Sequence, residues 1–283
     1  MPVRVYNDDM DYVLNNKDLL IRVSSDGAEL KSIAFHGREY LWQGEQPWSS
    51  SSPVLFPFAG RRKNFCYDYC GKTYPMPLNG FAKDLPFQFL GGKNELIFEL
   101  CDDKKTQTMY PFAFRLRIAY SIGTDTVFAA FSLENKDEKP MPYMWGLHPG
   151  FIIEEPSDWQ LRFDKTPVEL ILGPDMLLTG EERPFARLYR FDETLEHTRI
   201  VKDYGTCALL YNDLFGRSVT IHSTDPDVLA IWRPPIDHFP LVSLEPWCGI
   251  SDLKKPVPIM RNPHVRILAP HTFAKTVWSF TFK

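Results

Sequence analysis

Apolar and polar residues alternate along most of this chain with a period of two residues. The clearest example is a pair of segments at residues 112–122 and 127–135, which a Gly-Thr-Asp turn at residues 123–125 joins. A period of two places successive side chains on opposite faces of a strand, so this pair predicts a β-hairpin with one buried face. The first segment places Arg115 and Arg117 on its exposed face and its apolar residues, Phe114, Leu116, Ile118 and Tyr120, on the other face.

The same pattern predicts strands from one end of the chain to the other. No window carries an apolar stripe of helical period over the usual length, and the 24 prolines would interrupt most helices. Many strands and almost no helix predict an all-β fold, either a sandwich or a barrel. Further strands are expected at residues 19–23, 28–35, 40–42, 65–70, 96–100, 141–148, 159–163, 168–172, 208–211, 219–222, 229–232, 242–245, 265–268 and 273–282.

Two segments interrupt this pattern. Residues 46–57 are rich in Ser, Pro and Trp and are interpreted as a long surface loop within the domain. Residues 174–198 carry several charges and are interpreted as a second loop with a possible helical turn. Their charges are typical of a solvated face.

The composition favours one folded domain over residues 1–283. Hydrophobic residues make up 44% of the chain and charged residues 24%, which is enough apolar material for a large core. All-β sandwiches and barrels of more than about 200 residues commonly form one domain. The net charge of -4 provides no general attraction for nucleic acid or for an anionic membrane, so neither partner is expected.

The N-terminal residues lack the basic and apolar regions of a signal peptide, and no apolar stretch is long enough for a transmembrane helix. A cytoplasmic location is therefore expected. The five cysteines include no CxxC pair and no neighbouring histidine at metal-ligand spacing. We expect reduced thiols and no metal site.

Local motifs for the common hydrolases, nucleotide-binding enzymes and zinc proteases are absent from the sequence. A β-fold without them can still form a sugar site from dispersed residues at strand ends and in loops, where carboxylate, His, Arg and Trp side chains meet hydroxyls and ring faces. Composition alone does not distinguish a sugar-binding module from a sugar enzyme.

Four segments in order resemble the aldose 1-epimerases. The first two are PVLFPFAGRRKN at residues 53–64 and GKTYPMPLNGFAK at residues 71–83. The later two are WGLHPGF at residues 145–151, which resembles the family's histidine motif, and VSLEPW at residues 242–247, which resembles its late glutamate strand. The segment EYLWQ at residues 39–43 is similar to the branch that includes LacX-type proteins and hexose-6-phosphate epimerases.

The resemblance implies a galactose mutarotase-like supersandwich of antiparallel strands. It also implies an interconversion of the α and β anomers of a hexose or related sugar that needs no metal or cofactor. Ring opening removes the proton of the anomeric hydroxyl and delivers a proton to the ring oxygen, so an acid and a base are expected to flank the sugar. On the family pattern, Glu245 is the expected base and His148 the expected acid.

The resemblance also supplies candidate substrate-binding residues. Arg61 matches the family arginine that binds the sugar, and its planar donors suit vicinal oxygens. Arg62 and Lys83 lie where the phosphosugar branch has cations, and Trp247 is a candidate for stacking on the sugar ring. Asn79 stands where the family has a second histidine, and an amide can bind a hydroxyl but cannot transfer a proton.

Three alternatives to an epimerase of free sugars remain open. The substitution at Asn79 is compatible with a non-catalytic sugar-binding protein on the same fold. The cations Arg62 and Lys83 are compatible with an epimerase for a hexose 6-phosphate. A domain that binds another protein would be indicated by a large apolar surface patch. The expected partner is a small-molecule sugar, and the expected state is a monomer or a homodimer.

Overall fold

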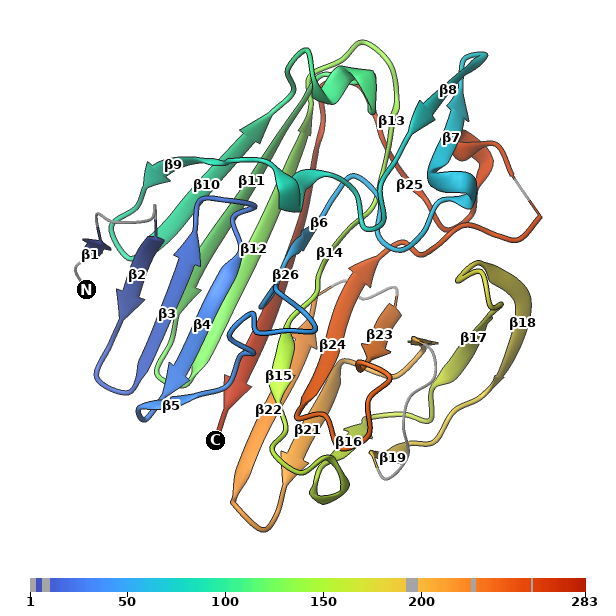
Figure 1. Cartoon of the computed structure of the whole chain (residues 1–283). Coiled ribbons are helices and arrows are strands. Elements are labelled where there is room, and N and C mark those ends of the chain that lie inside the picture. Colours follow the sequence, from blue (N-terminus) through green and yellow to red (C-terminus); the bar gives the residue numbers. More distant parts are fainter. Residues whose placement is uncertain (1–3, 7–10, 192–197, 225–227, 256) are drawn as a thin grey trace.

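A computed structural model of the chain describes residues 4–6, 11–191, 198–224, 228–255 and 257–283. Within these residues the fold consists of antiparallel β-sheets with a few short 3₁₀ helices (Figure 1). The predicted all-β class is confirmed. No helix among the described residues is long and apolar enough to cross a membrane.

The largest sheet has nine strands and contains the hairpin that the sequence predicts most clearly. Phe114 of β11 pairs with Asn135 of β12, and the apolar residues of β11 alternate inward while Arg115 and Arg117 are more exposed. The strand order is β19 (Leu188–Arg190), β16 (Gln160–Phe163), β21 (Cys207–Asn212), β22 (Arg217–Ser223), β26 (Phe273–Phe282), β12 (Thr126–Asn135), β11 (Phe114–Ile122), β10 (Glu95–Cys101) and β9 (Gln88–Gly91).

The second large sheet contains β24 (Leu241–Cys248), a strand of eight residues that are all buried. In Figure 1, β24 lies near the middle of the molecule. The order of this sheet is β18 (Leu178–Pro184), β17 (Val168–Leu172), β20 (Arg199–Lys202), β23 (Val228–Trp232), β24, β14 (Trp145–Leu147) and β6 (Val54–Leu55), and β15 (Gly150–Ile152) also pairs with β24.

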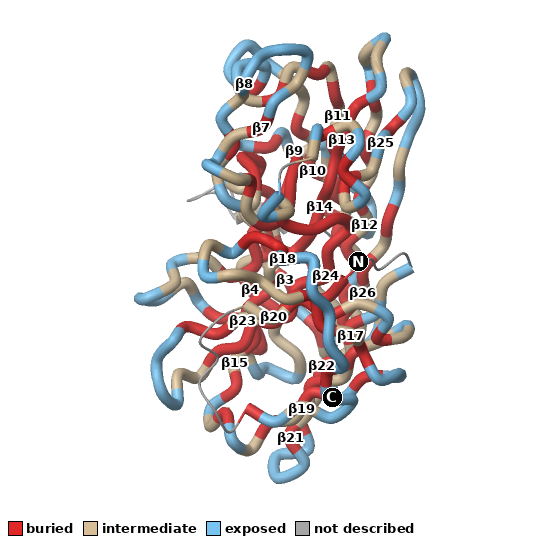
Figure 2. The backbone as a smooth tube through the Cα atoms, turned by 90° about the vertical axis from the view of Figure 1, so that its right-hand side faces the viewer, coloured by how far each residue is buried: buried red, intermediate tan, exposed pale blue. Residues whose placement is uncertain are grey.

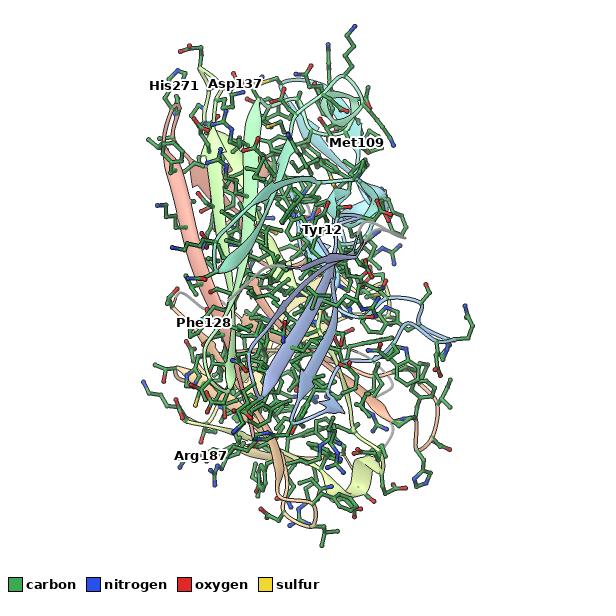
Figure 3. All side chains as sticks on the ribbon, turned by 90° about the vertical axis from the view of Figure 1, so that its left-hand side faces the viewer. Tyr12, Met109, Phe128, Asp137, Arg187 and His271 are labelled. Atoms are coloured by element: carbon green, nitrogen blue, oxygen red, sulfur yellow. The ribbon has the colours of Figure 1, made fainter. Side chains whose placement is uncertain are left out.

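Smaller elements surround the two large sheets. Tyr12 of the N-terminal sheet, labelled in Figure 3, belongs to an aromatic contact between sheets. Its ring stacks on Phe89 of β9, with ring centroids 3.8 Å apart. The N-terminal sheet consists of β1 (Arg4–Tyr6), β2 (Asp11–Asn15), β3 (Leu19–Ser24), β4 (Leu30–Phe35) and β5 (Arg38–Glu39). Two-stranded sheets pair β7 (Cys66–Tyr69) with β8 (Lys72–Pro75), and β13 (Met141–Tyr143) with β25 (Arg266–Leu268). The 3₁₀ helices are Lys63–Phe65, Ala82–Asp84, Thr106–Thr108, Pro156–Asp158 and Ile259–Arg261.

One cluster of buried apolar side chains extends from Leu14 to Phe282 and includes the fully buried Trp145, Trp159 and Trp278. Figure 2 shows that the buried residues concentrate in the strands, whereas many turns are exposed. Because burial of apolar area is the main favourable term in folding, this core fixes the position of β24 and of the side chains it carries.

The two interpreted loops differ from expectation. Residues 51–57 are buried, and Val54–Leu55 form β6, which pairs with β14. Val54, Leu55 and Phe56 belong to the hydrophobic core, and Glu29 Oε1 accepts hydrogen bonds from the backbone N–H groups of Ser51 and Ser52, at 2.6 and 3.1 Å. The second segment contains strands β18 and β19 and no helical turn in its described part, while residues 192–197 lie outside the described residues. None of the five cysteines forms a disulfide.

Candidate active site

A cavity of about 740 Å³ lies against the eight-stranded sheet, and five of the seven candidate residues line it: Asn79, Lys83, His148, Glu245 and Trp247. Glu245 and Trp247 reach it from β24, Trp232 from β23, and His148 from the segment between β14 and β15. Its volume is within the usual range of small-molecule sites, and its lining combines aromatic faces with a few polar groups. No cluster of metal-binding side chains occurs in the part of the chain that the structure describes.

Strand β24 supplies three side chains of the candidate site from one face. Ser243, Glu245 and Trp247 are spaced by two residues, so their side chains point the same way. The strand pairs on both edges, with β23 and with β14 and β15, so the backbone that carries these side chains is held in place.

His148 and Glu245 are in direct contact. Nε2 of His148 lies 3.1 Å from Oε1 of Glu245, and their side chains are only 12% and 2% exposed. The two groups therefore lie side by side at the cavity, and their placement about a bound sugar stays a prediction. The contact is still compatible with ring opening because the anomeric hydroxyl and the ring oxygen are bonded to the same carbon. The second carboxyl oxygen, Oε2, is buried and has no hydrogen-bond partner among the described residues.

Burial sets the charge of this pair. Loss of water around the imidazole lowers the pKa of His148 to about 4, and loss of water around the carboxyl raises the pKa of Glu245 well above its ordinary value. The indole N–H of Trp247 lies close enough to oppose the shift at Glu245, although it does not form a hydrogen bond of good geometry. Both directions favour a pair that is neutral overall and holds one proton.

Two tryptophans that the sequence did not single out enclose the imidazole. The ring centroids of Trp48 and Trp232 lie 5.1 and 5.7 Å from that of His148, and both side chains line the cavity. Trp48 is held in place in part because Trp42 Nε1 donates a hydrogen bond to its carbonyl oxygen at 2.9 Å. Aromatic faces of this kind can stack on the apolar face of a sugar ring.

The glycines beside His148 make room for the tryptophans. A Cβ atom on Gly150 would lie 2.4 Å from the Trp48 ring, and one on Gly146 would lie 2.6 Å from Cδ1 of Trp247. Neither distance is possible between unbonded carbon atoms. The glycines of the histidine motif therefore allow the aromatic walls of the cavity to approach the backbone.

Asn79 lines the cavity from a turn in which its backbone is left-handed, with φ of 64°. Asn tolerates this conformation better than most residues. Its Oδ1 accepts a hydrogen bond from the backbone N–H of Gly60 at 2.8 Å, which ties the turn to the neighbouring segment. The amide N–H₂ makes no hydrogen bond to the described residues and is available to a ligand.

The two adjacent arginines are engaged by the protein. Arg61 is not among the residues that line the cavity; its Nη1 donates to the carbonyl oxygen of Asp175 at 3.0 Å, and its guanidinium stacks on Phe65. Arg62 is fully buried, and it forms an ion pair with Asp252 at 3.0 Å. The structure thus corrects the prediction that Arg62 binds substrate, because its side chain has no access to the cavity.

Lys83 and Trp247 both lie where a ligand could reach them. Lys83 lines the cavity, but its Nζ already forms an ion pair with Asp84 at 2.5 Å. Trp247 presents a largely buried ring beside Glu245.

Sequence reasoning missed Ser243, Trp48 and Trp232. Ser243 could have been found by counting two residues back from Glu245 along the strand. Trp48 lies in the segment that was interpreted as a surface loop. Trp232 had no distinguishing local signal.

The comparisons with known proteins agree with this fold. The chain is 27% identical to the LacX proteins of Lactococcus lactis subsp. lactis over 304 aligned positions, which cover 96% of this chain and 99% of LacX. A galactose mutarotase related enzyme from Lactobacillus acidophilus superimposes with a TM-score of 0.92 at 28% identity, over 97% of both chains. A galactose 1-epimerase from Lactobacillus acidophilus NCFM has the same fold, with a TM-score of 0.76 at 14% identity over 100% of this chain and 98% of the other.

The pattern of the aldose 1-epimerase family matches residues 10–248, which is most of the chain. The expected galactose mutarotase-like supersandwich is therefore confirmed, and the chain belongs to the aldose 1-epimerase family.

Proposed function

We propose that this protein interconverts the α and β anomers of an aldose, with Glu245 and His148 as the proton-transfer pair. The observation that carries the proposal is the 3.1 Å contact between the two side chains beside a cavity, where one oxygen of Glu245 has no hydrogen-bond partner among the residues that the structure describes. A buried polar atom without a partner is costly unless a ligand satisfies it.

The reaction needs one proton on the pair at all times. The shared proton first passes from Glu245 to His148, and in this ionised form the Glu245 carboxylate takes the proton of the C1 hydroxyl as the bond between C1 and the ring oxygen breaks. The His148 imidazolium gives its proton to the ring oxygen, and C1 becomes a carbonyl. After rotation about the C1–C2 bond, the reverse transfers close the ring on the other face. The pair then again holds one proton, so the cycle consumes no external acid or base.

We propose that the substrate is an uncharged sugar. Three observations support this choice over a hexose 6-phosphate. Arg62 is buried against Asp252, and Arg61 donates to a backbone carbonyl outside the cavity lining. Lys83, the cation found in the lining within the described ranges, already pairs with Asp84. A phosphate would therefore meet no unpaired cation at this part of the site.

Exchange between anomer signals in NMR tests the proposal. With galactose or glucose, added protein should raise the exchange rate, and Glu245→Gln and His148→Asn should each abolish most of the increase. Glu134→Gln is a matched control because Glu134 lies on β12 of the other large sheet and pairs with Arg115. An unchanged exchange rate for free sugars and for their 6-phosphates would refute the proposal.

The substitution of the family histidine by Asn79 favours a second candidate, a sugar-binding protein without turnover. Calorimetry with the same sugars separates the two functions. Binding without any increase in anomer exchange would support the second candidate. Loss of binding in Asn79→Ala would indicate that the amide contacts the sugar.

A further inference from the structure

A chain of hydrogen bonds extends from His148 to the backbone of its own segment. Nδ1 of His148 lies 2.8 Å from Oγ of Ser243, and Oγ of Ser243 lies 2.9 Å from the carbonyl oxygen of Pro149. The same carbonyl accepts the backbone N–H of Leu244 at 3.2 Å. The serine hydroxyl and the backbone of β24 therefore fix one end of the imidazole.

The direction of these bonds follows from the groups involved. A carbonyl oxygen can only accept, so the single hydroxyl proton of Ser243 is donated to Pro149. Oγ of Ser243 must then accept from His148, which places a proton on Nδ1. Nε2 of the neutral ring is left with a lone pair that faces Oε1 of Glu245 at 3.1 Å. One proton can occupy this second contact, either on the carboxyl or on the imidazole.

We propose that Ser243 is a positioning residue that holds His148 as the Nδ1–H tautomer and so keeps its Nε2 available for the proton shared with Glu245. The tautomer follows from the hydrogen bonds alone. Its catalytic consequence rests on the proposed function.

The surroundings of the imidazole leave few other ways to hold it. Trp48 and Trp232 pack against the ring, and Ser243 is fully buried. Glu245 is the ionisable group in contact with the ring, and the other ionisable residues that line the cavity in the described part of the chain are Glu29, Lys83 and Asp84. Without the serine oxygen, the Nδ1–H group would be buried without its partner, and the tautomer that places a proton on Nε2 would become competitive.

The tautomer can be measured without substrate. Nitrogen-15 NMR of histidine-labelled protein distinguishes a protonated from an unprotonated ring nitrogen, and the signals that disappear in His148→Asn identify His148. At neutral pH, Nδ1 should be protonated in the wild type, with the shared proton on Nε2 or on Glu245. In Ser243→Ala, the Nδ1 signal should move toward that of an unprotonated nitrogen. An unprotonated Nδ1 in the wild type, or an unchanged signal in Ser243→Ala, would overturn the inference.

Kinetics test the consequence for catalysis. At metal-bound histidines, loss of the group that orients the ring typically costs about 10- to 100-fold in activity, and we take the same factor for His148. Ser243→Ala should therefore lower kcat by about this factor with KM changed less than about twofold, and Ser243→Thr should restore part of kcat because it keeps the hydroxyl. Ser32→Ala is a matched control, since Ser32 is a buried serine that bonds Glu39 in the N-terminal sheet.

The outcomes separate this inference from the proposed function. If the wild type has the expected tautomer but no epimerase activity, the proposed function fails and the tautomer assignment stands. If the enzyme is active and Ser243→Ala retains more than half of kcat, the positioning role is refuted.

Discussion

The largely buried pairs Arg62–Asp252 and His148–Glu245 differ in what surrounds the carboxylate. Asp252 accepts through both oxygens, from Arg62 and Asn262 at Oδ1 and from the backbone N–H of Lys63 at Oδ2. Glu245 contacts His148 through one oxygen, and its other oxygen has no partner in the described structure. Both oxygens of Asp252 thus accept hydrogen bonds from the protein, whereas one oxygen of Glu245 beside the cavity accepts none from the described residues.

The comparison shows that burial and charge alone do not identify a functional group. Arg62 is adjacent in sequence to the family's sugar-binding arginine position, yet its guanidinium donates to the carbonyl oxygen of Ile250 and to Asp252. Its burial lowers the pKa of the guanidinium to about 10, so it still carries its charge at neutral pH. The unused hydrogen-bonding capacity of Glu245, rather than its burial, is what points to a ligand.

The largest expected effect is on the functional pair. Glu245→Gln should lower kcat by about 10³-fold, because general acid–base catalysis typically contributes 10² to 10⁴. Its free energy of unfolding at pH 6 should change by less than about 1 kcal/mol, since glutamine is similar in shape to the protonated acid. Anomer exchange and urea unfolding measure the two quantities. A large loss of stability in Glu245→Gln with normal kcat would mean that Glu245, like Asp252, serves the fold and not a ligand.

The structural pair should respond in the opposite way. Arg62→Met removes the partner of Asp252 and should lower the free energy of unfolding by about 3 kcal/mol, with kcat of the folded enzyme within about twofold of wild type. Urea unfolding and anomer exchange again provide the measurements. A tenfold rise in KM with unchanged stability would restore Arg62 as a substrate-binding residue.

A smaller effect is expected at a glycine behind the functional pair. Gly146→Ala places a Cβ 2.6 Å from Trp247, so the indole must shift, at a cost of about 2 kcal/mol in stability. We expect KM to rise several-fold because Trp247 lines the cavity. Gly123→Ala is the control, because its Cβ would meet Phe128 at an ordinary 3.6 Å. Equal effects of the two substitutions on KM would argue against a role for Trp247.

The pH dependence of stability should reveal the shared proton. The pKa of His148 is lowered from 6.5 to about 4, so between these values only the unfolded chain binds its proton and stability rises with pH. The pKa of Glu245 is raised above 4.5, so above this pH only the folded chain keeps its proton and stability falls with pH. The two contributions oppose each other between pH 4.5 and 6.5 in the wild type.

Single substitutions should separate the two contributions. Over this range, Glu245→Gln should leave a rising contribution of up to about 1.4 kcal/mol per pH unit, and His148→Asn should leave a falling one. Urea unfolding at several pH values, with the wild type as reference, measures both. Slopes of the same sign in the two variants would contradict a pair that holds one proton.

The smallest effect is expected at the ion pair of Lys83 and Asp84, which is partly exposed and lines the cavity. Lys83→Met should change stability by less than about 1 kcal/mol, as is usual for exposed ion pairs. KM for an uncharged sugar should change less than about threefold. If the wild type converts a hexose 6-phosphate and the variant raises KM for it tenfold or more, the substrate is the phosphorylated sugar.

The local sequence predicts a strand correctly where buried and exposed residues alternate, and it fails to predict one where they do not. The strand β11 has one buried face, and its pattern could be read directly. In β18, six of seven residues are exposed, so no alternation marks it as a strand. The segment at residues 51–57 has the composition of a loop, and its partners, Glu29 and strand β14, are more than twenty positions away in the sequence.

The candidate site was predictable in part for the same reason. The motifs identified His148 and Glu245, but their direct contact is a tertiary feature that connects β24 with the segment between β14 and β15. The adjacent residues Arg61 and Arg62 could not be sorted by sequence, since the position of Asp252 and of the Asp175 carbonyl determines what each guanidinium binds.

The close approach of Gly146 to Trp247 and of Gly150 to Trp48 has a consequence for sequence variation. Each glycine and its tryptophan occupy one shared space, although about one hundred positions separate the members of each pair. A relative that gains a side chain at position 146 or 150 should carry a smaller residue at position 247 or 48, respectively. These paired exchanges would reshape the walls of the cavity and leave the histidine and glutamate unchanged, which offers a route by which one catalytic pair could be adapted to sugars of different size.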